Sequence, residues 1–292
     1  MNKNIWLFII PALIWGSTWF TIKFQLGVVD PLVSVVYRYL LAGIIMIIFC
    51  IATRRRMNFS IREHAFMALQ GFLLFGVNYW LVYEAEVYLA SGLIAVAYST
   101  LVFLNSMFGS LFLNRPINRQ ILMAALLGLV GTILIFGNEF LGLTFSKETI
   151  VGTIITAVSV IIASLGNITS ARNSANNIPV IQANAYGMLY GGIWMGLLAL
   201  ILDRPFTFDP SWSYIISLVY LTIFGSIVAF GTYLTLISRV GADKAAYALV
   251  IIPVIAVGIS YLFESYQMTV YAAIGVVLIL VGNVLAIQQK KA

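Results

Sequence analysis

The chain has little of what soluble proteins, disulfide frameworks and metal sites are built from. Only 9% of its 292 residues are charged, whereas charged residues make up about 25% of an ordinary soluble domain. One cysteine, Cys50, cannot close a disulfide, and with the single histidine, His64, it leaves too few soft ligands for a structural zinc site. We therefore expect no metal and no cofactor. Since 62% of the residues are hydrophobic and the mean hydropathy is +1.02, the composition indicates a multi-pass membrane protein.

Apolar runs of about the length that crosses a bilayer recur along the whole chain. The N-terminal run continues to Phe24 without a small-residue cleavage site, so we interpret it as a first span rather than a signal peptide. Ten spans are predicted: 5–24, 32–52, 65–83, 90–112, 120–136, 150–170, 179–202, 212–237, 245–263 and 268–287.

The net charge of +6 is carried by residues in the short gaps between these runs, which favours topology signals over nucleic-acid binding. With a cytoplasmic N-terminus, most of the sixteen basic residues fall in cytoplasmic segments, and Lys23, Lys147 and Arg204 fall outside. Arg38 lies within a span. The positive-inside rule therefore predicts cytoplasmic N- and C-termini and an even number of spans.

Two segments about 150 residues apart keep the same spacing of proline and glycine, Pro31 to Gly43 and Pro179 to Gly191. Chance similarity between apolar segments is the alternative. If the spacing reflects a duplication, residues 1–145 and 146–292 each hold five spans. An odd number of spans makes the two halves enter the membrane in opposite senses, as in transporters built from inverted repeats.

Several short stretches, in their order along the chain, resemble the EamA-type transporters of the drug/metabolite transporter superfamily. They are Ile14 to Thr18, Tyr37 to Ala42, the Arg115-Pro116 turn and Pro253 to Glu264. The resemblance implies an all-α membrane protein of ten helices in two inverted five-helix repeats around a central cavity, and export of amino acids, metabolites or drugs. Members often carry Glu before the Arg-Pro turn, where this chain has Asn114, whereas Glu264 retains an acid in the second half.

Arg38 is the first candidate for binding, because an arginine near a helix centre costs roughly 2.5–3.5 kcal/mol on insertion scales. Its guanidinium can hold a substrate carboxylate through two parallel hydrogen bonds. The structural alternative is that Arg38 snorkels outward or binds helix-end carbonyls and an acid such as Asp30.

Polar and aromatic side chains concentrate in the first, third and fourth spans more than a lipid-facing surface requires. An aromatic cavity with a few amides suits amphipathic organic solutes better than bare ions. For Trp80 and Tyr83 the aromatic belt at the outer interface is the favoured interpretation, and for Gly187, Gly191, Gly192 and Gly196 it is close helix packing. The candidate substrate-binding residues are Trp15, Trp19, Arg38, Asn78, Tyr79, Tyr98 and Asn105, with Asn167, Tyr233 and Tyr247 in the second half, where the resemblance favours the sixth span as cavity lining.

No acidic residue lies deep within a predicted span, so coupling to protons is the least readable feature. Glu84 and Glu86, at the end of the third span, are the coupling candidates, and uncoupled or weakly coupled transport is favoured. Pro11 and Pro253 each free a backbone carbonyl within a span and are candidate hinges or static kinks.

The sequence thus predicts a secondary transporter in the inner (plasma) membrane, most simply an exporter of small organic metabolites such as amino acids or related amphipathic solutes, by alternating access. Its partners are a small-molecule substrate and the lipid bilayer, with no nucleic acid; the oligomeric state, a monomer included, stays open. A receptor or scaffold, or an importer or facilitator of a nucleobase or vitamin-like solute, is the alternative. An enzyme is not expected, because no catalytic constellation lies in the spans and His64 falls in a basic cytoplasmic gap. A channel is not expected either, because it would show a charged ring or a carbonyl-rich selectivity filter and neither appears in the sequence.

Overall fold

The computed structural model describes residues 5–89, 94, 97–98, 100–117, 119–135, 146–252, 254–255 and 269–287, and every regular element in these ranges is a helix. The first half contains α1 (Ile5–Ile22), the short helical turn η1 (Lys23–Gln25), α2 (Pro31–Ala52), α3 (Ile61–Gln70), η2 (Gly71–Val77), α4 (Asn78–Tyr88), α6 (Leu101–Leu113) and α7 (Arg119–Ile135). The second half contains α9 (Lys147–Ala175), α10 (Val180–Ile201), α11 (Trp212–Tyr220), η3 (Leu221–Val228), α12 (Ala229–Val240), α13 (Ala242–Ala245), α14 (Tyr247–Val250) and α16 (Val270–Ile287).

Six described helical stretches are long and apolar enough to cross a membrane: 5–25, 31–52, 61–88, 147–175, 180–201 and 212–240. They correspond to the predicted first, second, third, sixth, seventh and eighth spans. The third, sixth and eighth are longer than predicted, because polar caps and helix ends extend beyond the apolar core of each run. Each of the other four predicted spans includes residues outside those that the structure describes. Pro253 and Glu264 also lie outside the described residues.

Helices begin where a polar side chain can satisfy the free backbone N–H groups of the first turn. Asp30 accepts a hydrogen bond from the backbone N of Leu32 at 2.8 Å, with Pro31 at the first helical position of α2. Ser60 and Glu63 form a reciprocal capping box at α3. The side chains of Ser146 and Ser211 cap α9 and α11 by accepting hydrogen bonds from the backbone N of Thr149 and of Tyr214.

Several local features recur at equivalent places in the two halves. The helix formed by α3 and α4 contains the π-helical segment η2, and the helix formed by α11 and α12 contains the π-helical segment η3, some 150 residues later. Helices α2 and α10 both contain 22 residues. Two residues after the end of each helix stands a residue with a left-handed backbone, Arg54 or Asp203, both with φ of 51°.

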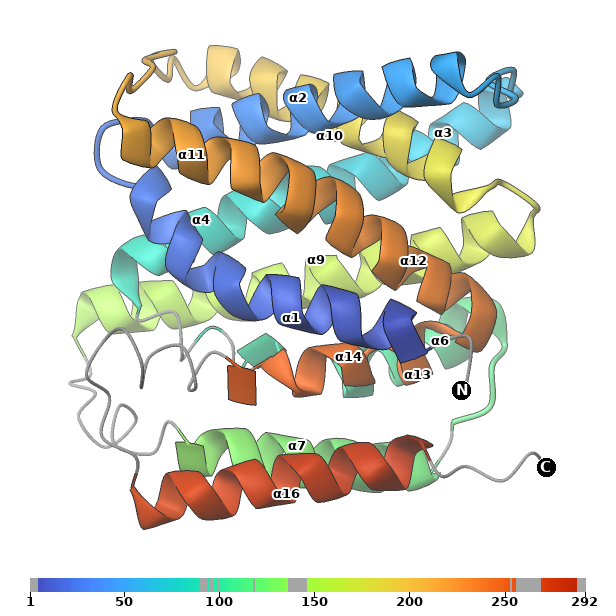
Figure 1. The fold of residues 1–292 in the computed structure, drawn as a ribbon, viewed down its shortest axis with the longest axis vertical. Helices are drawn as coiled ribbons and strands as arrows, with labels where there is room; N and C mark the ends of the chain where they lie inside the picture. The colour runs from blue at the N-terminus through green and yellow to red at the C-terminus, as the bar shows by residue number, and fades with distance from the viewer. Residues whose placement is uncertain are drawn as a thin grey trace.

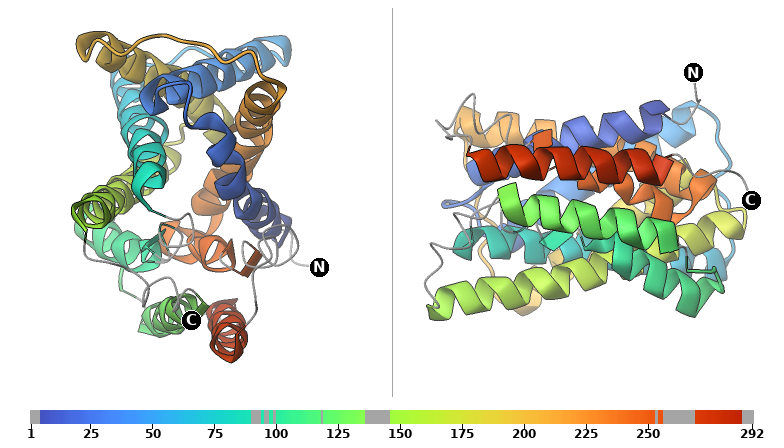
Figure 2. Two further views of the ribbon diagram at one scale, coloured as in Figure 1. Left: turned by 90° about the vertical axis from the view of Figure 1, so that its left-hand side faces the viewer. Right: turned by 90° about the horizontal axis from the view of Figure 1, so that it is seen from below.

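Helices α2 and α10 pack side by side at one end of the molecule, and α7 packs against α16 at the opposite end (Figure 1). The remaining long helices lie between these two pairs and surround the centre of the bundle (Figure 2). The start of α1 and the end of α16 lie at the same end of the helix axes (Figure 1).

Small residues allow α10 to pack closely against η2 and α2, as predicted for the glycines of the seventh span. A Cβ at Gly191 would lie 2.7 Å from the carbonyl oxygen of Gly71, and one at Gly192 would lie 2.8 Å from the backbone N of Leu40. Such contacts bring backbones close together, and they stabilise helix pairs in a medium where burial of apolar surface does little.

Candidate functional site

A cavity lies inside the bundle. Its walls include α1, α9, α12 and the continuous helix that η2 and α4 form together. The space not filled by protein atoms in and at the mouth of this cavity, open solvent included, amounts to about 680 Å³. Its described walls come from both halves of the chain and are mainly aromatic and aliphatic. Seven of the ten residues predicted to bind substrate line it: Trp15, Trp19, Asn78, Tyr79, Tyr98, Asn167 and Tyr233.

Edge-to-face aromatic contacts hold the walls of this cavity. The ring of Trp15 lies 4.9 Å from that of Phe230 and 5.1 Å from that of Tyr233, between centroids. The ring of Trp19 lies 5.6 Å from that of Tyr98. Because aromatic pairs prefer this geometry and each ring has few rotamers, the walls are stiff.

One side of the cavity carries a small polar network. Tyr98 donates its hydroxyl hydrogen bond to Asn78 Oδ1 at 2.6 Å, and the Tyr98 hydroxyl also lies 2.6 Å from Ser159 Oγ. Ser159 in turn donates to Asn78 Oδ1 at 3.0 Å. The network joins α4 to α9, so it fixes the position of two cavity walls as well as presenting polar atoms.

Two polar atoms of lining residues are buried without a hydrogen-bond partner among the described residues. They are the indole Nε1 of Trp19 and the Oδ1 of Asn167. The amide nitrogen of Asn167 donates to the hydroxyl of Tyr233 at 3.4 Å. Unpaired buried polar groups are costly, and they concentrate at functional sites.

Arg38 does not line the cavity but lies directly behind its wall, with 0% of its surface exposed. Its Nε donates to Ser226 Oγ at 2.8 Å and its Nη1 to the Tyr83 hydroxyl at 3.3 Å. Its guanidinium carbon lies 4.5 Å from the centre of the Tyr79 ring, which does line the cavity. The Nη2 atom has no hydrogen-bond partner among the described residues.

These contacts correct two interpretations made from the sequence. Arg38 neither snorkels outward nor binds Asp30, because the carboxylate of Asp30 lies 3.3 Å from Arg204 Nη1. Tyr83 is not part of an aromatic belt, because it is fully buried beside Arg38. Both partners of Arg38 come from other spans, and hydropathy does not reveal which apolar positions face inward.

Asn105 lies beyond the cavity rather than in its wall. Its amide nitrogen donates to the carbonyl oxygen of Ala242 at 3.1 Å, and its Oδ1 accepts from Ser164 Oγ at 2.7 Å. It lines a second, smaller cavity that extends along α6 to Arg115 and Pro116. Asn105 therefore joins α6 to α9 and α13 through hydrogen bonds, beside the cavity that reaches the Arg-Pro turn.

Two further predicted residues, Tyr247 and Pro11, are not among the described residues that line the cavity. Tyr247 belongs to α14, but its side chain lies outside the described part of the chain. Pro11 is buried inside α1, which continues through it as one helix. Thr18, Phe230 and Ser226 were not predicted; Phe230 stands three residues before Tyr233 on the same helix face, a spacing that could have identified it.

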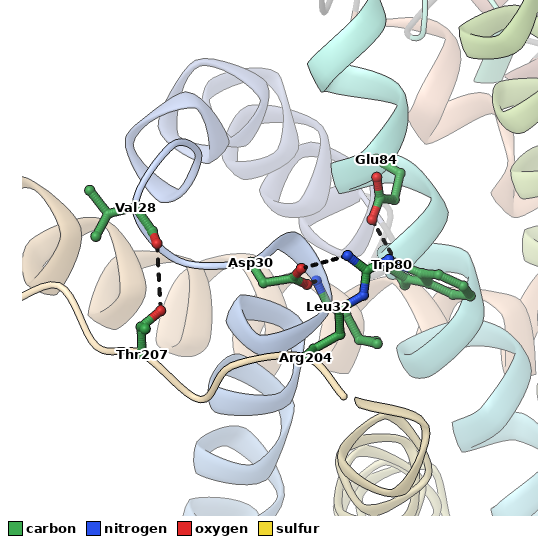
Figure 3. Close-up of polar contacts among 7 residues, drawn as sticks. All are labelled: Val28, Asp30, Leu32, Trp80, Glu84, Arg204 and Thr207. Carbon is green, nitrogen blue, oxygen red and sulfur yellow. Dashed lines mark hydrogen bonds and ion pairs between the residues drawn. The ribbon is translucent and has the colours of Figure 1, made fainter. Parts of the chain in front are cut away.

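The two coupling candidates differ in their surroundings. Glu84 accepts a hydrogen bond from Trp80 Nε1 at 3.0 Å (Figure 3). Both carboxylate oxygens of Glu86 are buried without a hydrogen-bond partner among the described residues, and the group interacts electrostatically with Lys23. Glu86, rather than Glu84, therefore has a carboxylate that is buried and not held by a hydrogen bond.

The loop that precedes α2 and the loop that follows α10 lie next to each other, near Trp80 and Glu84 (Figure 3). Asp30, before α2, pairs with Arg204, after α10. In the same loops, Thr207 Oγ1 lies 3.5 Å from the carbonyl oxygen of Val28. This rim is partly exposed, with 45% of the Arg204 side chain accessible.

Known proteins resemble this chain over nearly its whole length. It is 23% identical over 273 residues to the uncharacterized transporter YoaV of Bacillus subtilis (strain 168), which covers 93% of this chain and 92% of that protein. It is 29% identical over 270 residues to the uncharacterized inner membrane transporter YedA of Escherichia coli (strain K12), covering 91% and 85%. It is 23% identical over 279 residues to protein PagO of Salmonella typhimurium (strain LT2), covering 94% and 90%.

A solved crystal structure shares the fold with a TM-score of 0.77, at 18% identity over 98% of this chain and 96% of that one. The EamA-like transporter family matches residues 2–137 and again residues 150–288. With most of its length matched, and with six apolar helices long enough to span a bilayer, this multi-pass membrane protein belongs to the EamA-like transporter family.

Proposed function

We propose that the protein is a secondary transporter that exports small amphipathic organic solutes, such as amino acids or related metabolites, across the inner membrane by alternating access. The observation that carries this proposal is the central cavity, where aromatic walls combine with a few amide and hydroxyl groups. Such sites bury the apolar body of a ligand and orient it through a small number of polar atoms. The direction of transport rests on the resemblance to exporters, and the inner membrane on the printed name of the relative YedA.

We further propose ten spans in two inverted five-helix repeats, residues 1–145 and 146–292, with both termini in the cytoplasm. The matched π-helical segments η2 and η3 support this arrangement, as do the matching ends of α2 and α10. The two separate matches to the family also agree with it, as does the position of the start of α1 and the end of α16 at the same end of the helix axes (Figure 1). Repeats of this kind allow two similar halves to exchange conformations about a central site.

We interpret the hydrogen-bonded cluster of Asn105, Ser164 and Ala242 as a polar barrier between the central cavity and the smaller cavity that reaches the Arg-Pro turn. With that turn on the cytoplasmic side, as the charge bias predicts, such a barrier supports alternating access. In the exchange of conformations, this barrier opens while the opposite end of the central cavity closes, or the reverse.

The experiment is efflux from reconstituted vesicles loaded with labelled amino acids, nucleobases, aromatic carboxylates and aromatic cations. We expect at least one class of solute to leave these vesicles faster than it leaves loaded vesicles without protein. The absence of such flux for every class would overturn the proposal. Running the assay with and without a pH gradient tests coupling. We propose uncoupled or weakly coupled movement, and a gradient dependence that Glu86→Gln abolishes would instead assign proton coupling to Glu86.

A further inference from the structure

Arg38 is a buried positive charge for which the described residues provide only neutral partners. Serine and tyrosine hydroxyls accept two of its hydrogen bonds, and tyrosine rings lie over its planar face. A guanidinium keeps its charge in proteins, and a buried charge is normally paired. A structural role alone would be filled at lower cost by an apolar side chain of similar volume.

The unpartnered Nη2 atom lies beside Gly225, next to a residue of the cavity wall, Thr18. Gly225 has no side chain, and a Cβ built there would lie 3.1 Å from Nη2 and 3.2 Å from the methyl group of Thr18. Thr18 and Tyr79 both line the cavity. One layer of side chains therefore separates the charge from the bound solute, and in these low-dielectric surroundings its field reaches across that layer.

The described residues that line the cavity include no aspartate, glutamate, lysine, arginine or histidine. They offer no acidic partner for an ammonium group, while Arg38 favours one negative charge. The rings of Trp15, Trp19 and Phe230 provide an apolar surface for the rest of the solute.

We propose, resting on the transport function above, that the preferred solute is an aromatic or bulky apolar monocarboxylate with a net charge of −1. Its carboxylate binds at the corner formed by Thr18, Gly225 and Tyr79, in the field of Arg38. Its apolar body lies between the aromatic walls. Zwitterionic amino acids and aromatic amines of the same size bind more weakly, because each brings an ammonium group that has no acidic partner among the described lining residues.

Three solutes that share one phenyl ring and differ in charge provide the test at pH 7. They are 3-phenylpropanoate (anion), L-phenylalanine (zwitterion) and 2-phenylethylamine (cation). Binding to the purified protein is measured by isothermal titration calorimetry. We expect 3-phenylpropanoate to bind at least about tenfold more tightly than either of the others, and equal or reversed affinities in the wild-type protein would overturn the proposal.

Variants then locate the effect. Arg38→Gln should abolish the preference for the anion, whereas Arg38→Lys should retain part of it, because the charge is kept. Gly225→Ala places a methyl group against Nη2 and should weaken anion binding severalfold. The matched control is Gly231→Ala, in the same span, where a Cβ would meet nothing within 4 Å. If Gly225→Ala and Gly231→Ala bind the anion equally well, the binding corner is misplaced.

Vesicle flux separates failure of this inference from failure of the proposed function. Tight binding of the anion without flux of any solute would contradict transport and leave the binding preference standing. Flux of the zwitterion or the cation at rates equal to that of the anion, with no difference in affinity, would contradict the preference and leave transport standing.

Discussion

The packed seam between α2, α10 and η2 and the wall of the central cavity are both mainly apolar, yet they differ in how closely their helices approach. In the seam, glycines face backbone: a Cβ at Gly43 would lie 2.5 Å from the backbone N of Leu189, and one at Gly71 would clash with the carbonyl oxygen of Gly187. In the cavity wall, rings such as those of Trp15 and Tyr233 hold the helices apart.

Side-chain size, rather than hydrophobicity, therefore distinguishes the two regions. Within a bilayer, apolar side chains gain little by leaving lipid, so close packing of small residues holds helices together. Large aromatic residues leave space for a solute. We expect substitutions in the seam to affect folding and substitutions in the cavity wall to affect transport.

The largest effect is expected for Gly71→Ala. The added methyl group meets backbone that cannot move aside, and overpacking of this kind costs about 3 kcal/mol or more. We expect most of the folded protein to be lost, as measured by the monodisperse yield and thermal stability in detergent. Gly231→Ala is the control with space for a methyl group, and equal stability of the two variants would show that the seam is not closely packed.

In the cavity wall, Tyr98→Phe keeps the ring and removes the hydroxyl that contacts Asn78 and Ser159. We expect stability to fall by about 1–2 kcal/mol, because Asn78 loses a donor. Flux should fall about tenfold, mainly through a higher KM. An unchanged KM together with a large loss of folded protein would show that Tyr98 stabilises helix packing and does not bind the solute.

Asn105→Ala distinguishes the barrier from the binding site. The substitution removes the contacts with Ser164 and Ala242 but leaves the described cavity wall intact. We therefore expect KM within about twofold of the wild-type value and a severalfold change in maximal flux, measured in vesicles. A change in KM alone would return Asn105 to the substrate site predicted from the sequence.

The smallest effect is expected at the exposed rim. Asp30→Asn removes the ion pair with Arg204 but keeps a side chain that caps α2 well. Partly exposed pairs contribute about 0–1 kcal/mol, so thermal stability and flux should both change little. A loss of flux at constant stability would instead make this pair part of the gating mechanism.

Much of the site was predictable because amides, tyrosines and tryptophans deep in apolar spans have few reasons to face lipid. This argument identified residues as far apart as Trp15 and Tyr233, which meet in the structure. The sequence did not predict the partners of Arg38, since Ser226 lies 188 residues away on a different helix. Nor did it show that Tyr83 is buried, because a tyrosine near a span end is equally typical of an interface.

Substrate protection of a cavity position tests the central claim most directly. In a Cys50→Ala background, Asn167→Cys is labelled with a small membrane-permeant maleimide in the presence and absence of 3-phenylpropanoate. Ser238→Cys, at an exposed site near the end of α12, is the control. Our account predicts that the solute slows labelling severalfold at position 167 and leaves labelling at position 238 unchanged; equal labelling with and without any transported solute at position 167 would contradict it.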